Sequence, residues 1–125
     1  MLSPGPAQQI FLATEPVDMR GGFDRLACRV QQAGLDLYAG HLFVFLSKRR
    51  THLKILTHDG SGLVVLYKRL SRGRFTLPKV PPGARTATLD AASLATLLAG
   101  LQVVGVARSK SAEGPAASID AASAS

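Results

Sequence analysis

Short apolar runs bounded by turn residues fill the middle of the chain and constrain its fold more than any other feature. Between residues 41 and 77 the runs read HLFVFLS, THLKILT, LVVLYKRL and RFTL, and they are separated by a KRR tip, by DGSG at 59–62 and by SRG at 71–73. The pair Asp59-Gly60 is the clearest hairpin signal, because glycine accepts the positive φ that tight turns require. Consecutive short strands joined by tight turns predict an antiparallel meander.

The position of each strand in the sheet is also predicted by the pattern. In HLFVFLS both alternating sets of residues are apolar, which is typical of a central strand covered on both faces. In RFTL polar and apolar residues alternate, which predicts an edge or half-exposed strand at 74–77. Upstream, IFLAT at 10–14 predicts a further strand that ends at Pro16.

An amphipathic helix is predicted between Met19 and Gly34. Its apolar positions recur at i, i+3, i+4 and i+7, and they are Phe23, Leu26, Ala27 and Val30. We expect Phe23 to lie in the core with the rest of this stripe. Asp18 precedes the helix, where a carboxylate accepts from free N–H groups, and Gly34 follows it, where a left-handed residue is required.

A second helix is predicted after the Pro-Pro-Gly loop. Asp90 is a natural N-cap, and leucines follow at helical spacing at 94, 97, 98 and 101, so we expect Leu97 to lie in the core. The predicted fold class is therefore α+β, with an antiparallel sheet of four or five strands, a meander, packed by two helices. We expect residues 1–106 to form one domain. Residues 107–125 are poor in large apolar side chains and are expected to be a disordered tail.

Charge is the unusual part of the composition. The chain has 125 residues, a formal net charge of +7 and a pI near 10.3, and these values favour polyanionic partners. Its single cysteine, Cys28, excludes an internal disulfide. The sequence begins with no recognisable secretion signal and has no apolar run long enough to span a membrane, so we expect no membrane association and a cytoplasmic location.

Basic residues concentrate in the predicted meander. Nine Lys and Arg residues occur between positions 48 and 79, against a single acid, Asp59. Alternate turns of a meander lie at the same end of the sheet, so the KRR tip and the turn at 71–73 reach one rim, where such side chains suit phosphate oxygens. The alternative is a solvated rim that prevents sheet edges from pairing. The candidate nucleic-acid-binding residues are Arg49, Arg50, Lys54, Lys68, Arg69, Arg72 and Arg74, with Arg20 as an addition.

Catalytic and metal-binding patterns are weak in this sequence. His41, His52 and His58 have no cluster of further donors beside them in the sequence, and the eight acids are scattered. No nucleophile elbow or phosphate loop is recognisable. We therefore expect no catalytic residues, no metal site and no cofactor.

Several motifs together resemble a known family. In order they are PVDMRGGFDRLA at 16–27, GHLFVF at 40–45, RR at 49–50, LKIL at 53–56, DGSG at 59–62, YKRL at 67–70 and GRF followed by Pro78. They are similar to the accessory protein of insertion-sequence-66 type transposable elements, the TnpB-type product of the second open reading frame. The resemblance spans residues 10–101 and implies a helper in transposition beside a separate catalytic transposase.

The resemblance and the charge pattern lead to one expectation and two rivals. We expect a non-enzymatic protein that assists transposition by binding DNA or a transposase–DNA complex through the basic rim. The first rival is an adaptor that uses the same rim on an acidic surface of the transposase without touching DNA. The second rival is a small basic ribonuclease that depends on His41, His52 or His58.

Overall fold

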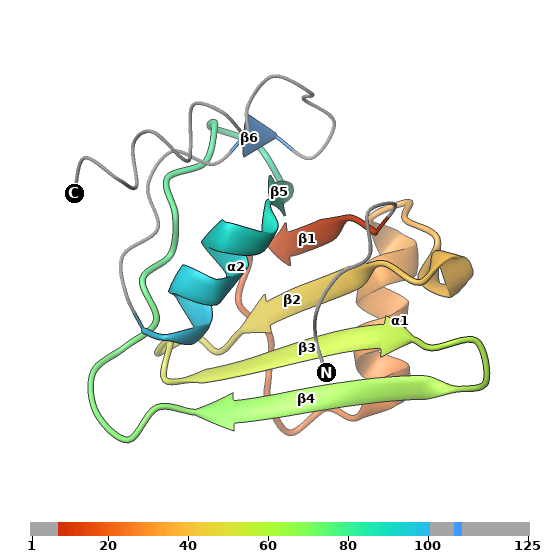
Figure 1. The fold of residues 1–125 in the computed structure, drawn as a ribbon, viewed down its shortest axis with the longest axis horizontal. Coiled ribbons are helices and arrows are strands. Elements are labelled where there is room, and N and C mark those ends of the chain that lie inside the picture. Colours follow the sequence, from red (N-terminus) through yellow and green to blue (C-terminus); the bar gives the residue numbers. More distant parts are fainter. Residues whose placement is uncertain (1–7, 101–106, 109–125) are drawn as a thin grey trace.

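The computed structural model describes residues 8–100 and the backbone of residues 107 and 108. In chain order its elements are β1 (Ile10–Ala13), α1 (Phe23–Gln32), the short 3₁₀ helix η1 (Leu37–Ala39), β2 (Leu42–Leu46), β3 (His52–His58), β4 (Leu63–Arg69), β5 (Thr86–Leu89), α2 (Ala91–Leu98) and β6 (Ala107–Arg108). The strands form one sheet in the order β4-β3-β2-β1-β5-β6. As Figure 1 shows, α2 lies in front of this sheet and α1 lies behind it.

The central meander is confirmed for β2, β3 and β4, which pair antiparallel. The turn between β3 and β4 begins at Asp59, whose carboxylate accepts from the backbone N–H groups of Ser61 and Gly62, and Gly60 has a φ of 98°. Every residue of β2 is buried, as expected for a central strand covered on both faces.

The predicted α+β class is confirmed, but the sheet is mixed rather than fully antiparallel. β1 pairs parallel with β2, and α1 forms the crossover that two parallel neighbours require. β5 pairs antiparallel with β1 on its other side, and β6 pairs with β5. The described part of the chain therefore has six strands, where the sequence predicted four or five.

The two faces of the sheet carry separate hydrophobic clusters. On the face covered by α2, residues such as Leu12, Val44 and Ile55 pack with Leu94 and Leu97 of the helix. The face covered by α1 uses a second set, in which Leu26 and Val30 of the helix join Phe11, Val17, Leu37, Phe43, Phe45 and Leu56. Burying each such side chain contributes about 1.5–3 kcal/mol. The sheet is thus the shared middle layer of a three-layer arrangement.

The ends of the helices test the predicted caps. Asp90 caps α2, since its side chain accepts from Ser93 N–H at 2.7 Å. Gly34 has a φ of 76° and follows α1, and its N–H donates to the carbonyl of Gln31. The predicted cap at Asp18 is wrong, because the N-cap of α1 is Gly22 and makes no side-chain bond. The chain between them forms a loop, and the Asp18 carboxylate binds within that loop.

The prediction that Phe23 lies in the core is also wrong. Phe23 is the first residue of α1 and is 48% exposed, whereas Leu26 one turn later is 1% exposed. Helical periodicity gives the direction in which the stripe points, but it does not give the point along the helix axis where contact with the sheet begins. Leu97, by contrast, is fully buried as expected.

The run at 74–77 was predicted to be a strand, and it is not one. The chain leaves β4 at one edge and must reach β5 beyond β1, a crossing of roughly 19 Å at about 4.8 Å per strand. Residues 70–85 make this crossing over the end of the sheet. Phe75, in the middle of the misassigned run, is 1% exposed because it closes the α2-side core at that end.

Ala107 and Arg108, the first two residues of the segment expected to be a disordered tail at 107–125, pair with β5. The remainder of that prediction, at 109–125, lies outside the described residues.

Candidate nucleic-acid interface

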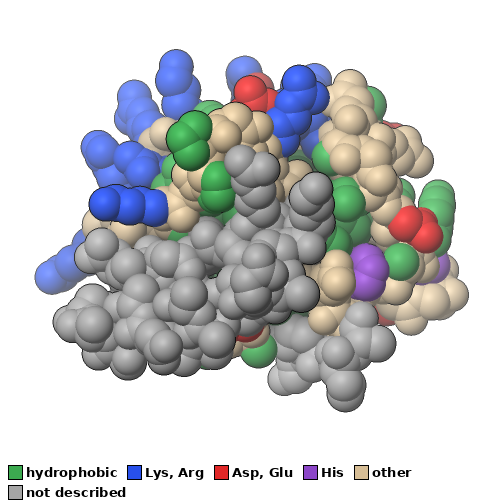
Figure 2. Space-filling model, turned by 90° about the horizontal axis from the view of Figure 1, so that it is seen from above, with side chains coloured by type: hydrophobic (Ala, Val, Ile, Leu, Met, Phe, Trp, Pro, Cys, Tyr) green, Lys and Arg blue, Asp and Glu red, His purple; other side chains and the backbone are tan. Residues whose placement is uncertain are grey.

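Sheet topology brings three basic segments to one end of the sheet. β1, β2 and β4 finish at this end and β3 starts there, so it carries the loop at 14–22, the turn at 47–51 and the segment at 69–74. Seven exposed cations belong to these segments, and we call them the basic end: Arg20, Lys48, Arg49, Arg50, Arg69, Arg72 and Arg74. The same segments contain two acids, Glu15 and Asp18. Figure 2 shows Lys and Arg side chains gathered on one side, the left in Figures 1 and 2.

The opposite end of the sheet has a different character. Asp36 caps η1 there by accepting from the N–H of Tyr38. The same end carries Asp59 of the β3–β4 turn and Asp90 of the α2 cap, together with His41 and His58. Backbone N–H donation from Ser61, followed by its hydroxyl and the N–H of Gly62, lowers the pKa of Asp59 from its usual value. That carboxylate therefore stays charged at neutral pH. Within the described residues, the two ends of the sheet thus carry charges of opposite sign.

Hydrogen bonds to the Ser47 side chain fix the turn at 47–51, and a backbone hydrogen bond joins this turn to the segment at 69–74 by way of Phe75. The Ser47 hydroxyl oxygen accepts from the N–H groups of Thr51 and His52, both at 3.2 Å. Arg50 has a φ of 60°, and its carbonyl accepts from Phe75 N–H at 2.6 Å. Because Phe75 is buried in the core, this bond fixes the position of the turn at 47–51 relative to the segment at 69–74.

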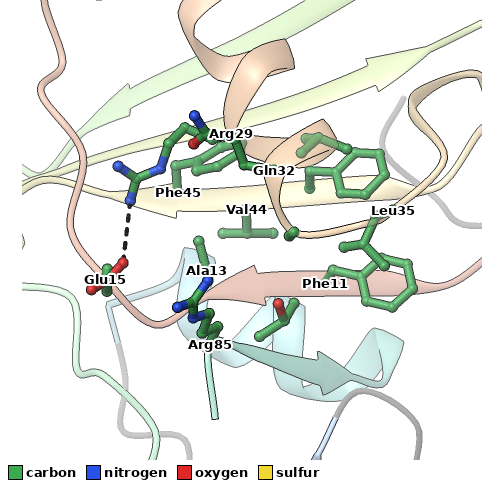
Figure 3. Close-up of a pocket in the computed structure, with 13 residues that line it drawn as sticks. Phe11, Ala13, Glu15, Arg29, Gln32, Leu35, Val44, Phe45 and Arg85 are labelled. Atoms are coloured by element: carbon green, nitrogen blue, oxygen red, sulfur yellow. Dashed lines mark ion pairs between the residues drawn. The ribbon is translucent and has the colours of Figure 1, made fainter. Parts of the chain in front are cut away.

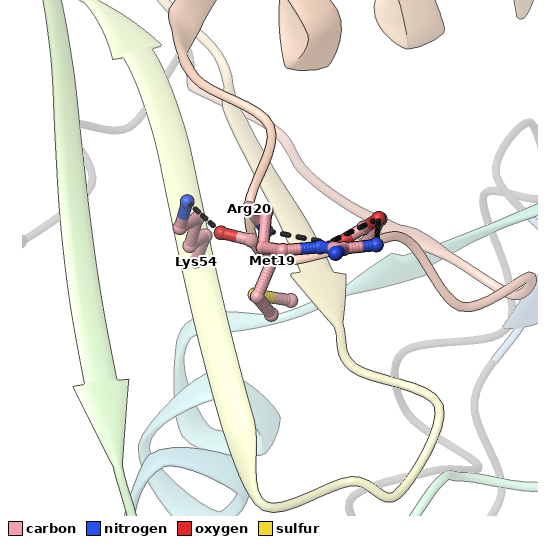
Figure 4. A network of polar contacts seen from close by, with 4 residues as sticks. Met19, Arg20 and Lys54 are labelled. Atoms are coloured by element: carbon pink, nitrogen blue, oxygen red, sulfur yellow. Dashed lines mark hydrogen bonds and ion pairs between the residues drawn. The ribbon is translucent and has the colours of Figure 1, made fainter.

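Lys54 does not belong to the exposed group. Only 9% of it is exposed, and its Nζ donates to the carbonyl of Met19 at 2.8 Å (Figure 4). The same Nζ also donates to the carbonyl of Gly21 at 2.9 Å. It also lies over the ring of Tyr67, 4.8 Å from the centroid. This placement argues against a phosphate contact at Lys54. Its side chain instead ties the loop at 14–22 to β3.

Lys68 is half-buried and has a structural partner as well. Its Nζ donates to the carbonyl of Leu98, the last residue of α2, at 2.6 Å. A cation at a helix C-terminus satisfies a free carbonyl and complements the helix dipole. The interaction joins β4 to α2, and it leaves Lys68 less free to meet a ligand than its neighbour Arg69, which is exposed.

Arg20 is exposed but ion-paired. Its guanidinium contacts the Asp18 carboxylate at 2.9 Å, and its backbone N–H donates to the same carboxylate (Figure 4). The side-chain bond from Arg20, with the backbone bond second, lowers the pKa of Asp18 to about 2. The pair therefore stays ionised at neutral pH, and Asp18 offsets much of the charge that Arg20 brings to the basic end.

A groove of about 500 Å³ opens between the loop at 14–22 and the turn at 47–51. Its lining includes Lys48, Arg49 and Arg20, and also two rings from the strands, His52 and Tyr67. Tyr67 is 54% exposed. Sequence reasoning singled out neither Lys48 nor Tyr67 as a site residue. Alternation of side chains along β4 was the available signal for Tyr67. It places Tyr67 on the same face of the sheet as Lys54, its cross-strand partner.

A second hollow lies beside α1 over β1 and β2, and it is mostly apolar. Phe11, Val30 and Leu35 contribute to its lining, and Arg29 and Glu15 form an ion pair of 3.9 Å beside it (Figure 3). Its volume of about 130 Å³ is smaller than the roughly 300–1,000 Å³ typical of small-molecule sites. We therefore do not assign a ligand to it.

The histidines are distributed between the two ends. His52 begins β3 and His58 ends it, which separates them by about 20 Å at roughly 3.3 Å per residue. His41 accepts from Gln9 N–H at the end where His58 lies. Within residues 8–100, no group of three or more His, Cys, Asp or Glu side chains is placed to hold a metal ion. This arrangement gives little support to a ribonuclease that combines His52 with either of the others.

Among the described helices, none has the length and apolar character needed to cross a membrane.

Comparison with known proteins agrees with the motifs. Residues 8–108 match the family described as IS66 Orf2 like protein. The uncharacterized protein y4hO of Sinorhizobium fredii (strain NBRC 101917 / NGR234) is 40% identical over 102 residues, covering 81% of this chain and 87% of y4hO. The uncharacterized protein y4jC of the same strain is 39% identical over 109 residues, covering 86% and 92%. No solved structure matches the chain. The chain therefore belongs to the IS66 Orf2-like family, which associates it with transposition of insertion sequences.

Proposed function

We propose that this protein binds the phosphate backbone of DNA through the basic end and assists transposition without catalysing it. The observation that carries the proposal is the gathering of seven exposed cations at one end of the sheet, on three segments that contain two acids. Folded surfaces usually mix the two signs of charge more evenly, so an excess of seven cations over two acids at one end favours an anionic partner.

The geometry of the basic end supports a phosphate ligand. Arg guanidinium groups bind phosphate oxygens through paired N–H donors. Six of the seven cations lie outside the Asp18 pair, and five of these six are exposed on turns or loops. Duplex DNA presents one negative charge per about 1.7 Å of axis, so an end of a domain meets several phosphates at once. Contacts of this kind orient the protein on DNA and carry little sequence information.

The transposition context supplies the biological partner in this proposal. The protein acts in the cytoplasm beside the element-encoded transposase, and the DNA that it binds is the DNA that the transposase processes. In this proposal the transposase carries out the chemistry of strand transfer, and this chain contributes binding alone.

The test is direct binding of the purified protein to a labelled 20-base-pair duplex, measured by fluorescence anisotropy over a salt series. The variant Arg49→Gln/Arg69→Gln/Arg72→Gln/Arg74→Gln removes four exposed cations. Unlike Lys54 and Lys68, these four donate to no backbone carbonyl within residues 8–100. If each contacts one phosphate, the slope of log K against log salt falls in magnitude by about 3.6, at about 0.9 per contact. Circular dichroism melts of both proteins serve as the folding control.

Two results would overturn the proposal. One is an absence of duplex binding by the wild type below 100 mM salt, and the other is an unchanged slope in a folded quadruple variant. Either result would favour the adaptor function, in which the same rim meets an acidic surface of the transposase. A pull-down of the tagged protein with and without nuclease treatment then identifies the partner, because an adaptor retains the transposase after the DNA is digested.

A further inference from the structure

We propose further that the groove beside Tyr67 binds an unpaired nucleotide, whose base stacks on the Tyr67 ring while the basic end holds its phosphates. This inference rests on the proposed function and deepens it, because it assigns single-stranded nucleic acid, rather than duplex alone, as a ligand of the same surface.

The first observation is the exposure of an aromatic ring among cations. Tyr67 is 54% exposed, although it lies on a strand whose neighbours Val65 and Leu66 are partly buried. Most large apolar side chains on this sheet are covered by α1 or α2. Three cations, Arg20, Lys48 and Arg49, and one acid, Asp18, line the groove, so its net charge is positive. An exposed ring in a groove of this charge is the feature with which proteins bind single strands without regard to sequence.

The second observation is that neighbouring side chains hold the ring in place. The Lys54 ammonium lies 4.8 Å from the centroid of the Tyr67 ring, and it is itself fixed by the carbonyls of Met19 and Gly21. The His52 ring lies beside Tyr67 with centroids 5.8 Å apart and an angle of 29° between the planes. Lys54 and His52 therefore restrain the Tyr67 ring before any ligand arrives, while 54% of the residue stays exposed.

The third observation is the composition of the groove around these rings. Lys48 and Arg49 line it from the turn at 47–51, and Arg69 follows on the same face of the sheet, since it pairs across the strands with His52. The groove is open to solvent and has a volume of about 500 Å³, which is room enough for one base. A base on Tyr67 therefore has cations within reach of the phosphates on either side of it. In an intact duplex the bases are stacked on one another and cannot use the ring.

Tyrosine fluorescence gives a test that leaves Tyr67 unchanged. The chain has two tyrosines and no tryptophan, so in a Tyr38→Phe variant the emission comes from Tyr67 alone. We expect a 12-nucleotide oligo-dT strand, and the matching oligo-U strand, to quench this emission on binding, and a 12-base-pair duplex to quench it much less. The DNA and RNA arms identify which unpaired strand binds more tightly.

Substitution gives the second test. Tyr67→Leu should weaken single-strand binding about tenfold, from base–aromatic stacking of about 1–3 kcal/mol, and should change duplex binding less than twofold. Tyr67→Phe should retain the affinity of the wild type. The matched control is Tyr38→Leu, which removes a tyrosine that is 67% exposed at the opposite end of the sheet and should leave both affinities unchanged.

The outcomes separate this inference from the proposed function. Duplex and single strands that bind equally, without quenching and without an effect of Tyr67→Leu, would overturn the inference and leave backbone binding intact. An absence of binding to every nucleic acid would overturn both. Quenching by a single strand together with a selective loss in Tyr67→Leu would establish the stacking site.

Discussion

Replacing Lys54 with methionine tests the assignment of this lysine to the fold rather than to the interface. The substitution keeps a long side chain but removes the donor shared by the carbonyls of Met19 and Gly21. Hydrogen bonds to a charged group contribute about 1.5–3 kcal/mol, and the contact with the Tyr67 ring adds about 0.5–1 kcal/mol. Because burying an ammonium has its own cost, we expect a net loss of about 2–3 kcal/mol in the free energy of unfolding.

Urea unfolding and thermal melts measure this loss. For a chain of this length we expect the melting temperature to fall by roughly 6–15 °C. The matched control is Lys48→Met in the exposed turn nearby, which should change the stability by less than about 0.5 kcal/mol. Equal stability of the two variants would refute the reasoning, because it would mean that the buried ammonium contributes nothing beyond its own desolvation.

Two further predictions concern the loop at 14–22 and the crossing at 70–85. An NMR titration should place the pKa of Asp18 at about 2, below the usual 3.8, and Arg20→Gln should raise this pKa. Because the folded-state pKa is lower than the unfolded one, any stability from this ion pair is present above pH 3.8. That stability is lost as the pH falls toward 2. A normal Asp18 pKa in the wild type would contradict the ion pair. Phe75→Ala should cost about 3–5 kcal/mol by urea unfolding, whereas Phe23→Ala at the exposed start of α1 should cost less than about 1 kcal/mol, and the reverse order would contradict the fold.

The elements that the sequence predicted well are those whose signals are local. The hairpin at Asp59-Gly60, the cap at Asp90 and the left-handed Gly34 each depend on side chains and backbone angles within a few residues. The uniform burial of β2 was also readable, because both of its faces are apolar. The errors come from long-range geometry. The segment containing Phe75 has strand-like alternation, yet the sheet order requires it to cross the end of the sheet instead of pairing.

The residues of the candidate site likewise fall into two groups, those that local patterns predicted and those whose role depends on long-range contacts. Arg49, Arg50 and Arg72 lie at a common end as predicted, because β4 ends at the same end of the sheet as β2. The reason is not a further turn of the meander, since no strand follows at 74–77. Charge alone could not separate Lys54 from the others, since its role depends on carbonyls of a loop more than thirty residues away in the sequence. Tyr67 was missed for a related reason. Its exposure depends on α1 leaving this part of the sheet uncovered, and no local pattern encodes that.

The most direct test of backbone binding compares two variants with the same net charge. Arg72→Gln/Arg74→Gln removes two exposed charges from the basic end, and Ala91→Glu/Ala92→Glu adds two exposed acids at the start of α2, at the opposite end. Salt-series anisotropy on the same duplex should show a slope reduced by about 1.8 in the first variant. The second should keep the wild-type slope, because the added charges lie beyond a screening length of about 10 Å. Equal reductions in both variants would mean that binding follows net charge alone, and would contradict an interface at the basic end.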